Sequence, residues 1–215
     1  VANIIQSCGD TLQGIVAIGG GIVCDLAGFA AGLLRTELTY IPTTLLAMAD
    51  VCVGGKTGVN TNAGKNQLGL FYFPNQVFIY PDFLKTLPKP QMLSGLSECY
   101  KHAFLTGDQN LVELINEVTQ QLNTLNWKLL RRVMDVKAQV VKEDPVENGV
   151  RATLNLGHTL GHGIEALNHK TAKDPNDIIP HGNAVGYGML FAFYLSKKYA
   201  GLSTLSCEQL SKSLV

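Results

Sequence analysis

The sequence lacks an excess of charge of either sign. Its 17 Lys and Arg residues are matched by 17 Asp and Glu residues over 215 positions, and no Lys/Arg cluster has the density of a surface that binds a phosphate backbone. These absences argue against nucleic acid or an anionic membrane as the main partner. We expect neither nucleic acid nor a membrane as a partner, and a small molecule as the main ligand.

The sequence also lacks paired cysteines and long apolar runs. Its five cysteines are odd in number, widely scattered and never spaced as CxxC, so neither a disulfide framework nor a thiolate zinc site is indicated. The longest apolar run, residues 184–195, contains glycine and is too short to span a bilayer. No basic-then-apolar leader opens the chain. We therefore expect reduced cysteines in a cytoplasmic protein.

Hydrophobic residues make up 46% of the chain, which is enough to bury a sizeable core. An apolar run at residues 14–18 leads through the glycines at 19–21 into a helical pattern of small residues. A β-rich run at 38–41 meets Pro42, a residue that suits the first turn of a helix, and a third strand at 76–80 ends before a proline. The first part of the chain is therefore predicted to be α/β.

Beyond residue 90 the apolar period changes to 3.6 residues, and long strands are no longer expected. The helical segments are 92–105, 111–123, 129–141 and 182–200. The LPKP stretch at 87–90 is the natural hinge. The pattern predicts an α/β domain at residues 1–88 followed by an all-helical domain at residues 89–215.

Two helix starts in the first domain suit a phosphate. GGGIVCD, residues 19–25, follows a strand and opens a helix, where backbone N–H groups and the helix dipole favour an anion. It lacks the GxGxxG spacing, and a tight turn without a ligand explains it equally well. Thr43 and Thr44 begin another helix, but capping alone explains them.

Residues 50–69 form a predicted glycine-rich loop that contains Lys56, Lys65, Asn60 and Asn66. Lysines buried in such a loop are costly unless an anion or a carbonyl meets them. A solvated surface loop is the alternative. We favour a binding site, because GxK and GKN elements flanked by apolar residues are unusual for a plain surface.

The second domain holds a candidate metal-binding inventory. Glu98 and Lys101 share a helix face at i, i+3, which an intrahelical salt bridge would also explain. His158 and His162, four residues apart, would share another face, and His181 follows. One carboxylate with several imidazoles is the donor set of a catalytic zinc that keeps a position open. A single histidine is more often structural.

A protease of the HExxH type is excluded, because Thr159 stands where that motif requires glutamate. Arg151 and Asn155 lie one turn apart just before His158. They direct a guanidinium group, which can bind an anion, and an amide group toward the same region. The polar content suggests a small, anionic, polyhydroxylated substrate.

Eight segments follow one another in the order GGGIVCDLAGFAAG, IPTTLLAMAD, VGGKTGVN, GKN, DFLKTLP, GLSECYK, RATLNLGHTLGHGIE and HGNAVGYGM. Together they closely resemble the 3-dehydroquinate synthase family of sugar-phosphate cyclases. The resemblance covers nearly the whole chain. It implies a Rossmann-like α/β NAD domain followed by an all-helical domain, usually in a homodimer.

The resemblance also implies site residues. Zinc, with Co²⁺ as an alternative, falls to Glu98, His158 and His181. The implied NAD-binding residues are Gly21, Ile22, Val23, Cys24, Asp25, Thr43, Thr44, Lys56, Lys65, Phe83, Leu84, Lys85 and Thr86. The implied substrate-binding and catalytic residues are Asp50, Lys56, Lys65, Asn66, Lys101, Arg151, Asn155 and His162, besides His158 and His181. Glu165 is left with a supporting or structural role.

The family activity is that of a carbon–oxygen lyase in the shikimate pathway. It converts 3-deoxy-D-arabino-heptulosonate 7-phosphate to 3-dehydroquinate and phosphate. NAD oxidises a ring hydroxyl transiently, phosphate is eliminated, the hydride returns, and an intramolecular aldol reaction closes the ring. The partner implied is therefore a phosphorylated sugar acid.

The chain departs from the family pattern in several places. The family usually has HGEAV where Asn183 stands, so we expect a carboxylate near His181 to be missing. The segment between Glu165 and His181 is longer than usual. Arg35 is a candidate for an arginine that reaches across a dimer interface in the family. The amino-terminal strands and the final helices of the pattern are absent.

Two other classes of function stay open. One is a related cyclase, of the 2-epi-5-epi-valiolone synthase or 2-deoxy-scyllo-inosose synthase type, or a zinc or iron polyol dehydrogenase. The carboxylate-bearing substrate is favoured over these by Lys101, Arg151, Asn155 and the set of Asp50 and Lys56. The other is a non-catalytic fragment that keeps the fold as a binding module, but the retained metal and phosphate ligands argue against it.

Overall fold

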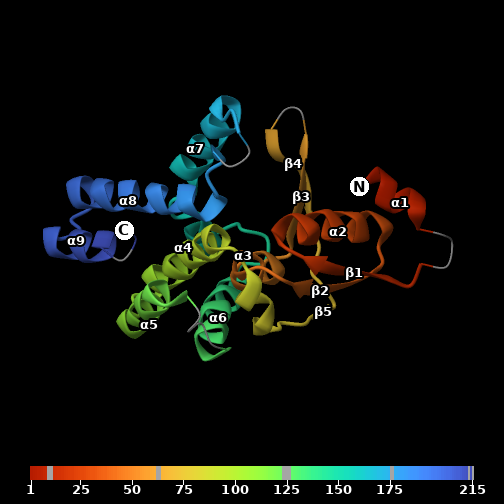
Figure 1. Ribbon diagram of the computed structural model, residues 1–215, viewed down its shortest axis with the longest axis horizontal. Coiled ribbons are helices and arrows are strands. Elements are labelled where there is room, and N and C mark those ends of the chain that lie inside the picture. The colour runs from red at the N-terminus through yellow and green to blue at the C-terminus, as the bar shows by residue number, and fades with distance from the viewer. Residues whose placement is uncertain (9–11, 62–63, 123–126, 175–176, 213, 215) are drawn as a thin grey trace. The chain divides into compact units, whose positions relative to one another are not determined.

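The computed structural model describes residues 1–8, 12–61, 64–122, 127–174, 177–212 and 214, and for Gly64 and Lys65 the backbone alone. The chain divides into two compact units, Val1–Leu87 and Pro88–Val215 (Figure 1).

The first unit is α/β, as predicted. Its elements are α1 (Ala2–Ser7), β1 (Gly14–Gly19), α2 (Gly21–Leu34), β2 (Glu37–Pro42), α3 (Leu45–Ala49), η1 (Val51–Val53), β3 (Lys56–Thr61), β4 (Gly64–Phe71), β5 (Gln76–Val77) and η2 (Pro81–Thr86). The three strands β1, β2 and β5 form a parallel sheet in the order β1-β2-β5. Since parallel strands need a crossover, α2 connects β1 to β2 and packs against both.

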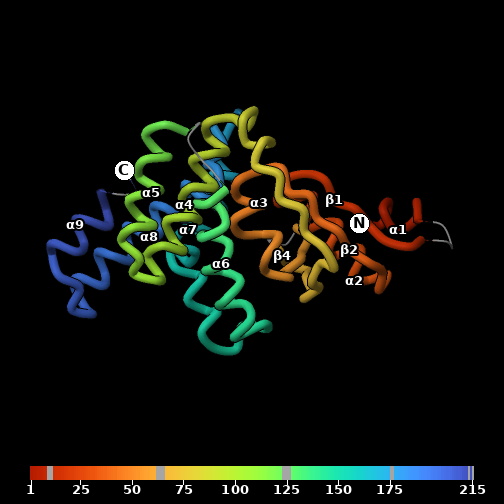
Figure 2. The backbone as a smooth tube through the Cα atoms, turned by 90° about the horizontal axis from the view of Figure 1, so that it is seen from below, coloured from red at the N-terminus to blue at the C-terminus, as the bar shows by residue number. Residues whose placement is uncertain are grey.

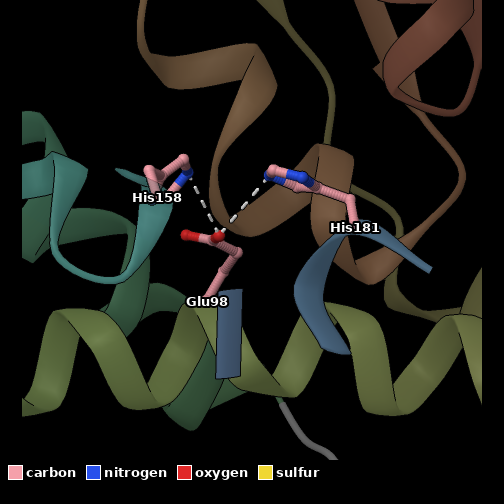
Figure 3. Close-up of side chains that lie close together, drawn as sticks. All are labelled: Glu98, His158 and His181. Carbon is pink, nitrogen blue, oxygen red and sulfur yellow. Dashed lines mark ion pairs between the residues drawn. The ribbon is translucent and has the colours of Figure 1, made fainter. Parts of the chain in front are cut away.

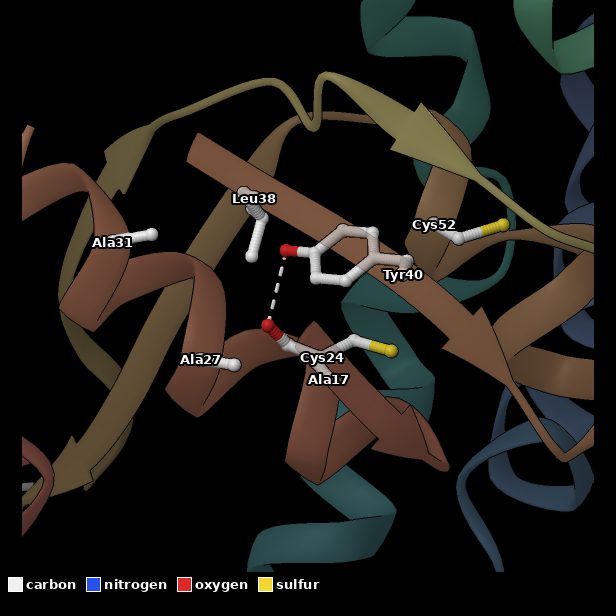
Figure 4. Close-up of a cluster of buried hydrophobic side chains, with 7 residues drawn as sticks. All are labelled: Ala17, Cys24, Ala27, Ala31, Leu38, Tyr40 and Cys52. Carbon is white, nitrogen blue, oxygen red and sulfur yellow. Dashed lines mark hydrogen bonds between the residues drawn. The ribbon is translucent and has the colours of Figure 1, made fainter. Parts of the chain in front are cut away.

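The core of this unit lies between α2 and the sheet (Figure 4). The buried side chains are Ala17, Cys24, Ala27, Ala31, Leu38, Tyr40 and Cys52. The hydroxyl of Tyr40 donates a hydrogen bond to the carbonyl oxygen of Cys24 across 3.0 Å, which satisfies the one polar atom that this ring brings into the core. Small residues on α2 let the helix lie close to the strands.

The glycine-rich segment at 50–69 is a β-hairpin for most of its length, so the prediction of a loop was wrong. Strands β3 and β4 pair antiparallel, with Gly58 opposite Gly69 and Thr57 opposite Leu70. The two glycines have no side chains that would reveal the alternation of a strand. A smaller correction concerns Pro42, which ends β2, whereas Thr44 caps α3 by accepting the N–H of Ala47.

The second unit is helical, and its described residues contain no strand. Its elements are α4 (Lys89–Thr106), α5 (Gln109–Gln120), α6 (Trp127–Glu143), η4 (Val150–Asn155), α7 (His158–Thr171), α8 (His181–Tyr199) and α9 (Thr204–Lys212). Helix α8 packs against α4 and α7, which a second direction of view also shows (Figure 2).

Two glycines permit the close approach of α8. A Cβ atom on Gly182 would collide with the carbonyl oxygen of Ser94 in α4, and one on Gly188 would collide with the carbonyl oxygen of Gly157 before α7. Backbone therefore lies against backbone at both contacts, and the first residue of α8 is fixed relative to α4 and α7.

All five cysteines are free, as expected. Within the ranges that the structure describes, no helix combines the length and the apolar character that crossing a membrane requires.

Candidate functional site

Three helices of the second unit bring Glu98, His158 and His181 together (Figure 3). Glu98 comes from the middle of α4, whereas His158 and His181 are the first residues of α7 and α8. The Nε2 atoms of His158 and His181 lie 3.7 and 3.8 Å from Oε1 of Glu98. Sixty residues of sequence separate Glu98 from His158, so helix packing alone creates this cluster.

Each histidine is placed by the residue before it. Gly157 adopts a φ of 81°, a left-handed conformation that glycine tolerates, and α7 begins immediately after it. Pro180 has an extended ψ of 146° and precedes the start of α8. Both imidazoles therefore stand at a helix amino terminus, free of the helix body and directed toward Glu98.

Hydrogen bonds fix the tautomer of both rings. Nδ1 of His158 lies 3.3 Å from the carbonyl oxygen of Leu156, and Nδ1 of His181 lies 3.0 Å from a carboxylate oxygen of Glu165. Both partners are acceptors, so each Nδ1 carries the proton and each Nε2 carries a lone pair. Burial lowers the pKa of His158 to about 4, although Glu98 opposes this shift. His158 is neutral at neutral pH.

The arrangement fits a divalent metal ion. Two nitrogen lone pairs face one carboxylate oxygen, and three electron-rich atoms repel one another unless a cation lies among them. Ligand atoms of a tetrahedral zinc ion are separated by about 3.3 Å, close to the 3.7 and 3.8 Å found here. The donor set of two nitrogens and one oxygen suits Zn²⁺ or Co²⁺ with a position left open.

Lys101 orients the carboxylate of Glu98. Its ammonium group pairs with Oε2, the oxygen that does not face the histidines, and the side chains are 2% and 0% exposed. The expected sharing of one helix face is therefore realised as a buried ion pair. Oε1 is left directed toward His158 and His181.

Arg151 and Asn155 both contact the segment that precedes η4. Arg151 is 2% exposed, and its Nη1 donates to the carbonyl oxygen of Pro145 across 2.5 Å. Asn155 is exposed and donates to Glu147 across 2.5 Å. Asp144 holds this segment: its burial opposes ionisation, but the N–H groups of Asn148, Arg151 and Gly149 lower the pKa of its carboxyl group below the ordinary value.

His162 belongs to a second group of potential ligands. Its ring centroid lies 5.3 Å from that of His158 and 5.9 Å from that of His181. With Glu165 and His181 it forms another set of three donor atoms close enough for one ion. His162 is exposed, whereas Glu165 is 5% exposed.

In the first unit, the predicted NAD-binding residues other than Lys56 and Lys65 lie at three places. Residues 21–25 form the first turn of α2, where Ile22 is exposed and the Cys24 side chain is buried in the core. Thr43 and Thr44 lie between β2 and α3, and the N–H of Thr43 donates to the carbonyl oxygen of Gly19.

The third place is η2, which contains Phe83, Leu84, Lys85 and Thr86. Leu84 is buried, and Lys85 pairs with Asp82 across 2.8 Å at the surface.

The predicted residues of the 50–69 segment lie in or before the hairpin. Asp50 follows α3 directly. Lys56 is exposed, so the argument from a buried lysine does not apply to it. The N–H of Asn66, which has a φ of 52°, donates to Oδ1 of Asn60 and so supports the hairpin. The Lys65 side chain lies outside the described residues.

Sequence reasoning missed two residues of the second unit. Lys137 is 6% exposed in α6, and Asp144 holds the segment around Arg151. The signal for Lys137 is its position, four residues after Val133 and four before Val141 on the apolar stripe of α6. A lysine on such a stripe places an ammonium group among buried side chains, where it needs a polar partner.

Comparison with known proteins finds a match to the same protein family in both units. The model of the amino-terminal part of 3-dehydroquinate synthase matches residues 2–94, and that of its carboxy-terminal part matches residues 95–215. The 3-dehydroquinate synthase of Alkaliphilus metalliredigens is 43% identical over 189 residues, which are 85% of this chain and 51% of that protein. The chain thus spans about half the length of this relative.

Solved structures of two cyclases share the fold. The 2-epi-5-epi-valiolone synthase of Streptomyces hygroscopicus with NAD⁺ and Zn²⁺ bound has a TM-score of 0.80 at 28% identity, over 94% of this chain and 57% of that one. A 2-deoxy-scyllo-inosose synthase complexed with carbaglucose-6-phosphate, NAD⁺ and Co²⁺ has a TM-score of 0.84 at 26% identity, over 99% and 59%. These matches confirm the predicted fold class. Because the family models together match residues 2–215, the chain belongs to the 3-dehydroquinate synthase family.

Proposed function

We propose that the protein acts as a 3-dehydroquinate synthase, which converts 3-deoxy-D-arabino-heptulosonate 7-phosphate to 3-dehydroquinate and phosphate. The observation that carries this proposal is the cluster of Glu98, His158 and His181, in which both imidazole lone pairs face one carboxylate oxygen. A metal ion held there would polarise a hydroxyl or carbonyl oxygen of the substrate.

The surrounding side chains suit an anionic, hydroxylated substrate. Lys101 and Arg151 are buried cations in the same unit as the cluster, and buried cations favour phosphate or carboxylate ligands. His162 is exposed beside both predicted metal-binding histidines, where it can accept or donate a proton to a bound hydroxyl group. Asn155 adds an exposed amide.

NAD is the second proposed cofactor, bound by the first unit. The parallel sheet, the Gly19–Gly21 turn and the first turn of α2 offer the strand–glycine–helix arrangement that favours a dinucleotide phosphate. The two related cyclases described above contain NAD⁺ together with Zn²⁺ or Co²⁺. NAD would remove a hydride from one ring hydroxyl of the substrate and return it, without net oxidation.

A related cyclase activity is the alternative. The shared fold of the two cyclase structures supports it, but their identity of 26–28% is well below the 43% shared with a 3-dehydroquinate synthase. We therefore propose the heptulosonate as substrate. The homodimer and the cytoplasmic location stay predictions, as does the assignment of the individual site residues.

The test is an assay of phosphate release. The protein supplied with NAD and zinc is expected to release inorganic phosphate from the heptulosonate 7-phosphate without accumulating NADH. Steady accumulation of NADH would indicate a dehydrogenase. Turnover with only sedoheptulose 7-phosphate or glucose 6-phosphate would favour a related cyclase and contradict the proposal.

A further inference from the structure

His181 has its own carboxylate partner, which the family pattern does not predict at this place. The pattern HGEAV has a glutamate two residues after the histidine, where this chain has Asn183. Position 183 is about 200° around α8 from position 181, because each residue of a helix turns by about 100°. Asn183 lines a separate cavity with Ser97, Tyr100 and Tyr187. It therefore does not contact the ring of His181 from that side.

The partner is Glu165. Its Oε2 atom lies 3.0 Å from Nδ1 of His181, and the residue is 5% exposed. Glu165 lies in α7 seven residues after His158, so the helix that supplies one predicted metal ligand also supplies the hydrogen-bond acceptor for the other. A buried carboxylate at this distance holds the proton on Nδ1 and leaves the lone pair on Nε2.

The tautomer decides which of two overlapping donor sets can hold the ion. Glu98, His158 and His181 form one set, and His162, Glu165 and His181 form the other. The first requires Nε2 of His181, which faces Glu98 at 3.8 Å. An ion in the second that used Nδ1 of His181 would displace the hydrogen bond between Nδ1 and Glu165. Moreover, the second set includes the exposed His162, whereas Glu98 in the first is fully buried.

We propose that Glu165 is a positioning residue for the metal centre: it holds His181 as the Nδ1–H tautomer and directs Nε2 to the site shared with Glu98 and His158. This inference rests on the proposed metal centre. The sequence predicted that a carboxylate near His181 would be missing, because position 183 is Asn. The proposal gives this role to Glu165, in α7.

The experiment compares Glu165→Ala and Glu165→Gln with the wild-type chain, and uses Glu113→Gln, an exposed glutamate in α5, as the matched control. Zinc affinity is measured by competition with a chelator. Loss of a hydrogen-bond acceptor behind a metal-binding histidine weakens metal binding by about 10–100-fold. We expect that loss for Glu165→Ala, a smaller loss for Glu165→Gln, whose amide oxygen still accepts, and none for Glu113→Gln.

Nitrogen NMR of the histidine rings in the metal-free chain gives a readout that a merely structural role would not change. We expect His181 to be the Nδ1–H tautomer in the wild type and to shift toward Nε2–H in Glu165→Ala. If Glu165→Ala fails to fold, the same comparison is made with Glu165→Leu, which keeps most of the volume of the side chain and has no hydrogen-bond acceptor. Unchanged affinity and tautomer in the folded variant would overturn the inference.

Zinc binding by further variants distinguishes failure of the positioning role of Glu165 from failure of the proposed metal centre. His158→Ala tests the centre alone, since Nδ1 of His158 faces the carbonyl oxygen of Leu156 rather than the carboxylate that holds His181. Zinc lost from His158→Ala but retained by Glu165→Ala refutes only the positioning role. Zinc retained by Glu98→Gln but lost from His162→Ala places the ion in the other donor set and refutes both.

Discussion

Lys101 and Glu98 form an ion pair in α4 that is almost entirely shielded from water, with side chains 2% and 0% exposed. Removing one partner of such a pair leaves a charge buried without compensation. Replacing Lys101 with methionine keeps the volume and removes only the charge. We expect Lys101→Met to lower the free energy of unfolding of the metal-free chain by about 3 kcal/mol, measured by urea denaturation.

Added zinc is expected to reduce this loss, because a cation bound to Glu98 replaces part of the missing positive charge. The control is Lys85→Met, since Lys85 pairs with Asp82 at the same i, i+3 spacing but with side chains 74% and 51% exposed. It should change the stability little. An equal loss of stability with and without zinc would argue that no cation binds at Glu98.

Helix α8 is predicted to tolerate a methyl group at one glycine and not at its neighbour. A Cβ atom on Gly188 meets the carbonyl oxygen of Gly157, whereas one on Gly186 meets only Oγ of Ser97 at an ordinary 3.6 Å. We expect Gly188→Ala to destabilise the fold by about 1–3 kcal/mol through overpacking. Gly186→Ala should be neutral or stabilising by up to about 1 kcal/mol, because alanine favours the helix.

Thermal or urea unfolding of both alanine variants checks this prediction. Because Gly157 precedes His158, Gly188→Ala should also weaken zinc binding, and Gly186→Ala should not. Equal stability of the two variants would show that α7 and α8 do not pack as described.

Acid should remove the stabilisation that Asp108 gives to α5. The backbone N–H of Leu111 and the guanidinium group of Arg132 lower the pKa of Asp108 below its ordinary value of 3.8. A carboxyl group with a lowered pKa in the folded state stabilises the fold above its ordinary pKa, and this contribution is lost as the pH falls through the lowered value.

Asp108→Asn keeps the capping oxygen and removes the charge. We expect the variant to unfold at lower urea than the wild type at about pH 7, and the difference to shrink below about pH 4. A difference that is constant across this range would contradict a contribution from the charge of Asp108.

The sequence was sufficient for many of the regular elements and insufficient for the hairpin. Apolar periodicity located β1, α2, β2, α4, α5, α6 and α8, because the spacing of apolar residues follows from the face that each element buries. It failed at β3 and β4, where Gly58 faces Gly69 and no side chain marks the alternation. The argument that favoured a binding site from a buried lysine also does not hold for Lys56, which is exposed in β3.

The candidate site was only partly accessible from the sequence. Spacing allowed His158 and His162 on one ion, and the family resemblance was needed to join His158 to Glu98 and His181, which three helices bring together. No sequence pattern gives the tautomer of His181 or its partner Glu165, since both depend on how α7 and α8 pack. The sequence also suggested that the missing carboxylate at position 183 would affect His181. In the structure, position 183 lies on a different side of α8 from His181.

The most direct test of the account is the zinc content of four purified variants. Glu98→Gln, His158→Ala and His181→Ala each remove one predicted ligand, and His169→Ala removes an exposed histidine in the last turn of α7. After dialysis with zinc and removal of the excess, the wild type and His169→Ala are expected to retain one zinc ion per chain. The three ligand variants should retain almost none while keeping the circular dichroism spectrum of the wild type. Stoichiometric zinc in any of these three would contradict the assignment of the metal centre.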